Sequence, residues 1–166
     1  MSKRRRGNRG GAIVVTGGRK RPIDKKIIGV DQLVTTSQTS TLLYTCSFAA
    51  TITGIRWVFS MQRRTTSLSR GFWAIVLVRD GQTPSTLAFS DTGTLYAPEQ
   101  NVLAWGQMCV APSNSTGGPV IEHDRGDTKA MRKVMGGDKL YCVAIGSVVD
   151  GIDFEGAVQF FLKGSG

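Results

Sequence analysis

The chain has 166 residues, with 21 Lys or Arg against 12 Asp or Glu and a formal net charge of +9. This length predicts one domain with a single core. No stretch approaches the roughly 20 apolar residues that cross a bilayer, and the apolar residues 12–15 are too few for a signal peptide, so the sequence predicts neither a membrane span nor a secretory leader.

The excess charge lies in residues 1–26, which we call the arm. The arm holds ten basic residues and one acid, 10 − 1 = +9, whereas residues 27–166 hold 11 of each and sum to zero. High charge and low hydrophobicity predict that the arm is flexible and disordered until it meets a polyanion such as single-stranded nucleic acid. A solvating tail or a signal for host nuclear import is compatible with the same residues. The candidate nucleic-acid-binding residues are Lys3, Arg4, Arg5, Arg6, Arg9, Arg19, Lys20, Arg21, Lys25 and Lys26.

Short β-like runs separated by Gly-, Pro- and Ser-rich turns follow the arm. Residues 27–34 are a first candidate strand, and residues 71–78 are apolar on both faces, as in a central strand. Further runs lie at 40–48, 85–90, 101–111 and 138–148. Strands at this spacing, without helical intervals, predict an all-β sandwich or barrel.

Two runs alternate with period two, so the sequence predicts which of their side chains face the core. At 51–62 the inward residues are Ile55, Trp57, Phe59 and Met61. At 154–163 they are Phe154, Val158, Phe160 and Leu162. The outward residues are then Arg56, Ser60 and Gln62 in the first run and Glu155, Gln159 and Lys163 in the second.

One segment, at 127–137, is ambiguous. Asp127 is a possible N-cap and Gly136 a possible terminator, with Met131 and Met135 spaced as on one helix face. Local sequence therefore favours a short helix and a strand equally. The polar stretches at 90–101 and 111–126 are predicted to be exposed loops.

Residues that could carry catalysis or bind a metal are sparse. His123 is the one histidine, no GxSxG or P-loop sequence is present, and the acidic groups lack EF-hand spacing. The sequence therefore predicts no enzyme activity, no metal and no cofactor. Two residue sets are predicted to pack instead: Cys46, Cys109 and Cys142 in the core, and Trp57, Trp73 and Trp105 in the core or at subunit contacts.

Several segments together resemble a known family. "TSTLLYTCSF...TITGIRWVFSM", "NVLAWG", "MRKVMGGDKLYCVAIGS" and "GAVQFFLK" are similar to strands of the single jelly-roll capsid proteins of small circular Rep-encoding single-stranded DNA (CRESS-DNA) viruses. The resemblance implies an eight-stranded jelly roll formed by residues 27–166, with its strands near 40–48, 51–62, 71–79, 85–90, 102–111, 127–135, 139–148 and 154–163. It also implies that 127–137 contains a strand.

The same resemblance implies a function. The chain would be a viral capsid protein that assembles in about 60 copies into a T=1 icosahedral virion, after passing through the host nucleus, with the arms inward on the genome. Sixty arms of +9 would supply about 540 positive charges, which suits a very small genome.

Three alternatives stay open. The arm does not distinguish DNA from RNA, although the resemblance favours DNA, so a small RNA virus or satellite virus capsid is one of them. A non-viral β-barrel nucleic-acid-binding module with a basic tail is the second, but it would need basic and aromatic residues interleaved on strand faces. An all-β enzyme is the third, and the missing catalytic residues disfavour it.

Overall fold

The structure, a computed structural model, describes residues 23–63, 69–84, 101–110, 121–147, 149 and 151–164. Within these ranges every regular element is a strand: β1 (Ile23–Val34), β2 (Thr39–Thr45), β3 (Ala50–Arg63), β4 (Ser69–Val78), β5 (Asn101–Val110), β6 (Ile121–Thr128), β7 (Arg132–Val134), β8 (Lys139–Gly146) and β9 (Ile152–Gly164). The prediction of an all-β fold is confirmed.

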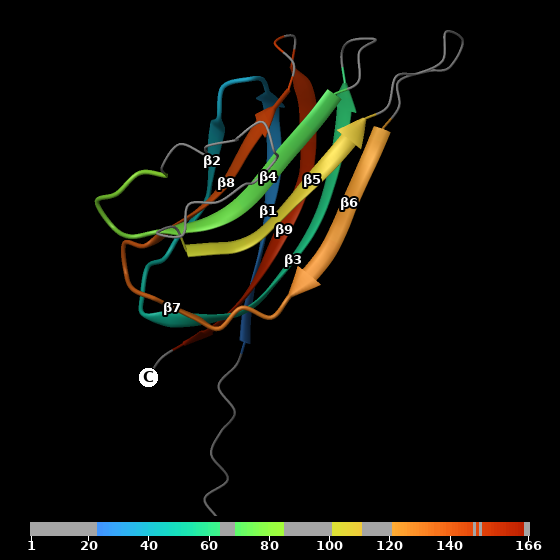
Figure 1. Ribbon diagram of the computed structural model, residues 1–166. Helices are drawn as coiled ribbons and strands as arrows, with labels where there is room; N and C mark the ends of the chain where they lie inside the picture. The colour runs from blue at the N-terminus through green and yellow to red at the C-terminus, as the bar shows by residue number, and fades with distance from the viewer. Residues whose placement is uncertain are drawn as a thin grey trace, which may run out of the picture.

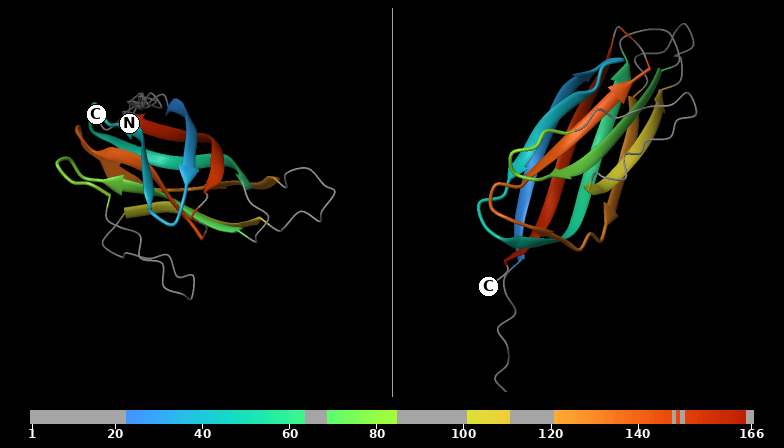
Figure 2. Two further views of the ribbon diagram at one scale, coloured as in Figure 1. Left: turned by 90° about the horizontal axis from the view of Figure 1, so that it is seen from above. Right: turned by 60° about the vertical axis from the view of Figure 1, so that its left-hand side comes forward.

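The strands form two antiparallel sheets that pack face to face (Figures 1 and 2). The first sheet has the order β1-β9-β3-β6, with the short β7 also paired to β3, and the second has the order β2-β8-β4-β5. Consecutive strands mostly lie in opposite sheets, so the eight long strands make a jelly-roll sandwich. The predicted fold class is therefore confirmed.

The core forms where alternating side chains of the two sheets meet. All but one of the residues predicted to face inward on β3 and β9 are fully buried, and Trp57 is half-buried. The Phe59 ring packs 4.8 Å from Trp73 of the opposite sheet and 4.7 Å from Phe154 of the neighbouring strand, measured between ring centroids. Strand β4 is buried on both faces, as predicted for a central strand, and on its outer face its side chains pack against Val143 of β8 and Val102 of β5.

The beginning of the sandwich differs from the prediction. Residues 23–26, which we assigned to the arm, are part of β1, where they pair with the end of β9 from Lys163 to Phe160. Strand β1 takes the first place in the jelly roll, so the runs at 40–48, 51–62 and 71–79 each stand one position later than the resemblance implied. The run predicted at 85–90 lies outside the described residues.

Strand β6 was missed, because residues 121–126 were predicted to be part of an exposed loop. Its sequence is almost entirely polar, and it lies at the edge of the first sheet, where charged side chains face solvent and limit pairing with other chains. Polarity is therefore a property of the edge position here and is not a sign of a loop.

At 127–137 the helix alternative is wrong, and the strand that the resemblance implied is present but interrupted. Asp127 and Thr128 end β6. Residues 129–131 belong to no strand, and the three residues of β7 then pair with Ala50–Ile52 of β3. Met131 and Met135, which a helix would have buried together, are both exposed, whereas Ala130 and Val134 enter the core. Burial of these two smaller residues decides the local conformation.

Candidate nucleic-acid interface

Of the predicted site residues, the structure describes only Lys25 and Lys26. The other eight (Lys3, Arg4, Arg5, Arg6, Arg9, Arg19, Lys20 and Arg21) lie outside the described residues. Lys26 forms an ion pair with Asp24 at 3.1 Å, in which both side chains are about half exposed. Such a surface pair contributes little to stability. Lys25 pairs in register with Phe161 on the outer face of the first sheet.

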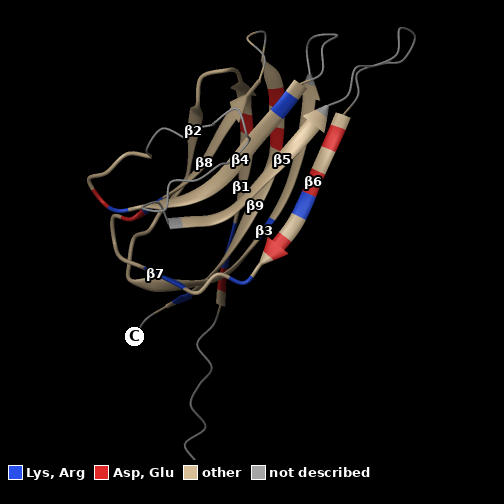
Figure 3. Cartoon of the chain, viewed as in Figure 1, with Lys and Arg blue, Asp and Glu red and all other residues tan. Residues whose placement is uncertain are grey.

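Other cations gather around Lys25 on the same face. Lys163, on β9, pairs with Ile23 of β1. Thr51 of β3 lies between Lys163 on one side and Lys133 of β7 on the other. Arg56, on β3, follows one step further along the sheet, opposite Gln159. We call this group the basic end; its members are Lys25, Arg56, Lys133 and Lys163. It lies where β1 begins and β9 ends (Figure 3).

The opposite end of the same outer face is acidic. Asp31 of β1 pairs with Glu155 of β9, and Asp153 follows two residues away on the same face. Lys163 follows Glu155 by eight positions on β9, which corresponds to about 26 Å at about 3.3 Å per residue. The sheet surface is therefore polarised along its strands. An anionic polymer is attracted to one end and repelled from the other.

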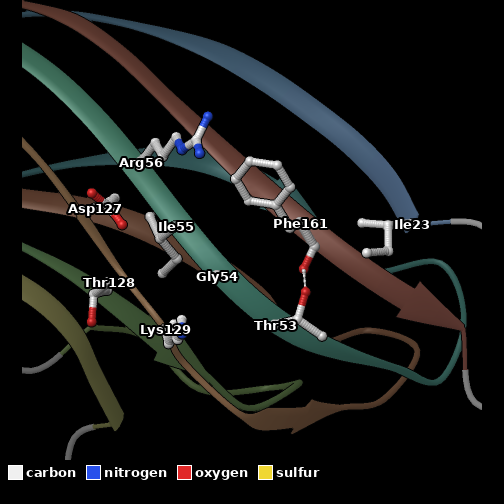
Figure 4. A pocket seen from close by; sticks show the side chains of 9 residues that line it. All are labelled: Ile23, Thr53, Gly54, Ile55, Arg56, Asp127, Thr128, Lys129 and Phe161. Carbon is white, nitrogen blue, oxygen red and sulfur yellow. Dashed lines mark hydrogen bonds between the residues drawn. The ribbon is translucent and has the colours of Figure 1, made fainter.

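A pocket of about 220 Å³ opens at the basic end, between β3, β6 and β9 (Figure 4). The guanidinium carbon of Arg56 lies 5.2 Å from the centroid of the Phe161 ring, a cation–π contact. The Thr53 hydroxyl donates a hydrogen bond of 3.1 Å to the Phe161 carbonyl at a β-bulge between Ile52 and Gly54. Ile23, Ile55, Asp127, Thr128 and Lys129 complete the lining.

A second, neighbouring hollow of about 360 Å³ shares Arg56 and Asp127 with the first and adds Arg125. Its floor includes Gly126, where a Cβ atom would come within 2.5 Å of the Trp57 ring. Glycine at this position therefore lets the indole pack directly under β6.

Sequence reasoning placed Arg56 and Lys163 on outward faces, and both are exposed. It did not identify them, or Lys133, as members of one site. The alternation that turns a side chain outward can be recognised in the sequence of a single strand. The register that aligns β1, β9 and β3 with β7 cannot be recognised in this way. The signal that could have found part of the site is the group of three basic residues at 129–133 (Lys129, Arg132 and Lys133).

Other candidate residues lie away from this site. His123 is exposed, as expected, but on strand β6 and not in a loop. Trp73 is buried and Trp57 half-buried, as predicted, whereas Trp105 is 60% exposed and so does not belong to the core. Cys109 is exposed as well, so its assignment to the core is wrong, while Cys46 and Cys142 are buried.

The described ranges contain no group of three or more His, Cys, Asp or Glu side chains placed to hold a metal ion. They also contain no helix of the length and apolar character that spans a membrane.

No protein-family model and no curated protein matches the sequence. Three solved structures are similar at low identity. The disulfide-linked pili of Bacillus endospore appendages match at 10% identity and a TM-score of 0.35, over 87% of this chain and 91% of theirs. The structure of the infectious bursal disease virus Gx strain matches at 10% identity and a TM-score of 0.36, over 89% of this chain and 33% of the matched chain. The structure of Desmodium yellow mottle tymovirus matches at 12% identity and a TM-score of 0.32, over 87% of this chain and 89% of the matched chain.

Proposed function

We propose that this chain is a viral capsid protein that assembles with copies of itself and packages single-stranded DNA through its basic arm. The observation that carries the proposal is the position of the basic end. The cations of residues 1–22 are followed directly by Ile23, which lies at the end of the sheet where Lys25, Lys163 and Lys133 gather.

The polarity of the first sheet gives each subunit an orientation on a polyanion. DNA bound by the arm lies close to the further lysines at the start of β1 and the end of β9. At the other end of the sheet, Asp31, Asp153 and Glu155 repel the DNA. The basic end therefore faces the genome and the acidic end points away from it. A tail that served only as a solvating segment would not require this arrangement.

The electrically balanced body suits self-assembly. Residues 27–166 sum to zero charge, so identical subunits can approach one another without net repulsion. Between the basic and acidic ends, the outer face of the first sheet carries Ile27 and Val58, which are 71% and 58% exposed. Trp105 and Leu42 are exposed on the second sheet. Apolar side chains of this kind are suited to contacts between copies.

The number of copies follows from the smallest closed shell. About 60 subunits in icosahedral symmetry would bring about 540 arm charges to the interior, enough to neutralise several hundred nucleotides. No enzyme activity and no cofactor is needed for this role.

Expression of the full chain, followed by electron microscopy and nuclease digestion, tests the proposal. We expect uniform closed particles containing nucleic acid that is protected from nuclease. Protected RNA in place of DNA would support the alternative of an RNA or satellite virus capsid. A stable monomer that binds oligonucleotides would instead favour a nucleic-acid-binding module, and a monomer without such binding would refute the proposal.

A matched pair of variants separates packaging from folding. The first deletes residues 2–21, and the second keeps their number but replaces the eight Lys and Arg residues by Ser and Gln. Both should lose protected nucleic acid and keep the cooperative thermal transition of the sandwich. For the unchanged chain, nine net charges predict a slope near −6 for the logarithm of single-strand affinity against the logarithm of salt concentration, at about 0.7 per contact.

A further inference from the structure

We propose that the pocket at the basic end binds one base of the packaged strand, and that it prefers a base with an exocyclic amino group. The inference rests on the proposed function, because it assumes that the arm brings single-stranded nucleic acid to this end. It goes further by assigning a folded, base-contacting subsite to residues that sequence reasoning did not connect.

The pocket offers a surface on which a base can stack. Phe161 faces outward and is half-buried, so its ring is held in place yet accessible. Arg56 lies against that ring, and a guanidinium plane can itself stack on a base while its N–H groups reach a phosphate. Aromatic and arginine side chains used together are typical of single-strand recognition.

The backbone keeps this pocket open. The bulge in β3 places Gly54 beside the Phe161 ring, where a Cβ atom would lie 3.6 Å from the ring and 3.4 Å from the Thr128 carbonyl oxygen. A side chain at position 54 would therefore fit the backbone but occupy the space that a base needs. The volume of about 220 Å³ lies below the range of about 300–1,000 Å³ that is usual for drug-sized ligands, so it suits a single ring system.

The polar rim of the pocket determines how a base would lie. The Asp127 side chain makes no hydrogen bond or ion pair with another described residue, and a carboxylate can only accept hydrogen bonds. An exocyclic amino group of cytosine, adenine or guanine donates such a bond, whereas thymine has no such group. Lys129 and Arg56, on the same rim, are placed for the phosphates.

The location of the pocket ties it to the arm. Ile23, the first residue of β1, is part of the lining, so no chain separates the arm's cations from the subsite. A single-stranded nucleic acid bound by residues 1–22 thus reaches the pocket without crossing the acidic end of the sheet.

Photocrosslinking of the full-length chain to a single-stranded oligonucleotide containing 5-iodocytosine tests the subsite. We expect a crosslink at Phe161, found by mass spectrometry in the peptide that spans β8 and β9. Crosslinks confined to residues 1–22 would overturn the subsite and leave the proposed function standing. If the full chain did not bind the oligonucleotide at all, the proposed function would fail as well.

Affinity measurements on variants test the assignment of each group. Phe161→Leu and Gly54→Val should each weaken oligo(dC) binding about five- to tenfold and leave the salt slope unchanged, because they remove base contacts only. Arg56→Gln should reduce the magnitude of the slope by about 0.7. Phe48→Leu, which removes an exposed aromatic residue that does not line the pocket, is the matched control and should bind like the unchanged chain.

Base preference gives a readout that loss of folding cannot imitate. The unchanged chain should bind oligo(dC) at least about fivefold more tightly than oligo(dT), and Asp127→Asn should reduce that ratio without a change in the thermal transition. Equal affinities for the two oligonucleotides in the unchanged chain would contradict the proposed role of Asp127.

Discussion

Asp124 on β6 accepts a hydrogen bond of 3.0 Å from the indole N–H of Trp73 on β4, and this bond joins the two sheets of the sandwich. The other carboxylate oxygen accepts a longer bond of 3.4 Å from the indole of Trp57. Gly106 on β5 leaves room for the carboxylate, because a Cβ atom there would lie 2.6 Å from Asp124 Oδ2. Residues of β3, β4 and β5 thus contact one carboxylate of a fourth strand, β6.

Replacing this carboxylate should loosen the contact between the sheets. Asp124→Asn keeps the shape but turns one acceptor into an NH₂ donor that faces an indole N–H. We expect a loss of about 1–3 kcal/mol in the free energy of unfolding, measured by urea denaturation. Glu122→Gln, on the exposed part of the same strand, is the control and should change stability by less than about 0.5 kcal/mol. Equal stabilities of the two variants would show that the indole bonds contribute nothing.

Asp138 should make stability depend on pH. Burial raises the pKa of this carboxyl, but hydrogen bonds from the Met135 and Asp80 N–H groups and the Arg79 guanidinium outweigh burial, so its pKa lies below the ordinary value. The stabilisation is complete above the unfolded pKa of about 3.9 and is lost as pH falls through the lower folded value.

Asp138→Asn should therefore be less stable than the unchanged chain at pH 7, by about 1–3 kcal/mol. The difference should shrink as pH falls below about 4, because protonation of Asp138 then removes the same interaction from the unchanged chain. Urea denaturation at pH 7 and at pH 3 checks this. A difference that stays constant over this range would mean that the carboxylate charge is not what stabilises the turn.

The three cysteines should differ in reactivity. Burial, together with the nearby charge of Asp138, raises the pKa of the Cys46 thiol to about 11, and burial alone raises that of Cys142 to about 12. Cys109 is exposed on β5. In unassembled native protein at pH 8, Ellman's reagent should titrate one thiol rapidly and all three only after denaturation. Cys109→Ser should remove the rapid phase, and a rapid phase that survives this substitution would contradict the assignment.

Gly156 is required where three strands of the first sheet come together. A Cβ atom on it would lie 2.1 Å from the Val58 carbonyl oxygen and 2.8 Å from the Phe59 ring, so the backbone would have to move. We expect Gly156→Ala to reduce the free energy of unfolding by about 3 kcal/mol or more. Gly29→Ala is the matched control, because its nearest neighbour would be 3.9 Å away. Thermal and urea unfolding of both variants checks the difference.

Predictions from the sequence succeeded where the information is local. The alternation of 51–62 and of 154–163 predicted the buried faces of β3 and β9, because a strand turns successive side chains to opposite sides. The same reasoning failed for β6, where an edge position permits a polar sequence, and for Cys109, whose apolar neighbours suggested burial. At 127–137 local preference was divided between helix and strand, and pairing with β3 decided the outcome.

The sequence by itself determined that this is an all-β protein and that its net charge is confined to the first 26 residues, since composition, turn spacing and periodicity are properties of neighbouring residues. Only the tertiary structure decided that Lys25, Arg56, Lys133 and Lys163 share one end of a sheet. It also decided that Arg56 lines a pocket there together with Phe161. The physical reason is register. Cross-strand pairing joins residues more than a hundred positions apart, and a shift of one residue would turn each of these side chains to the opposite face.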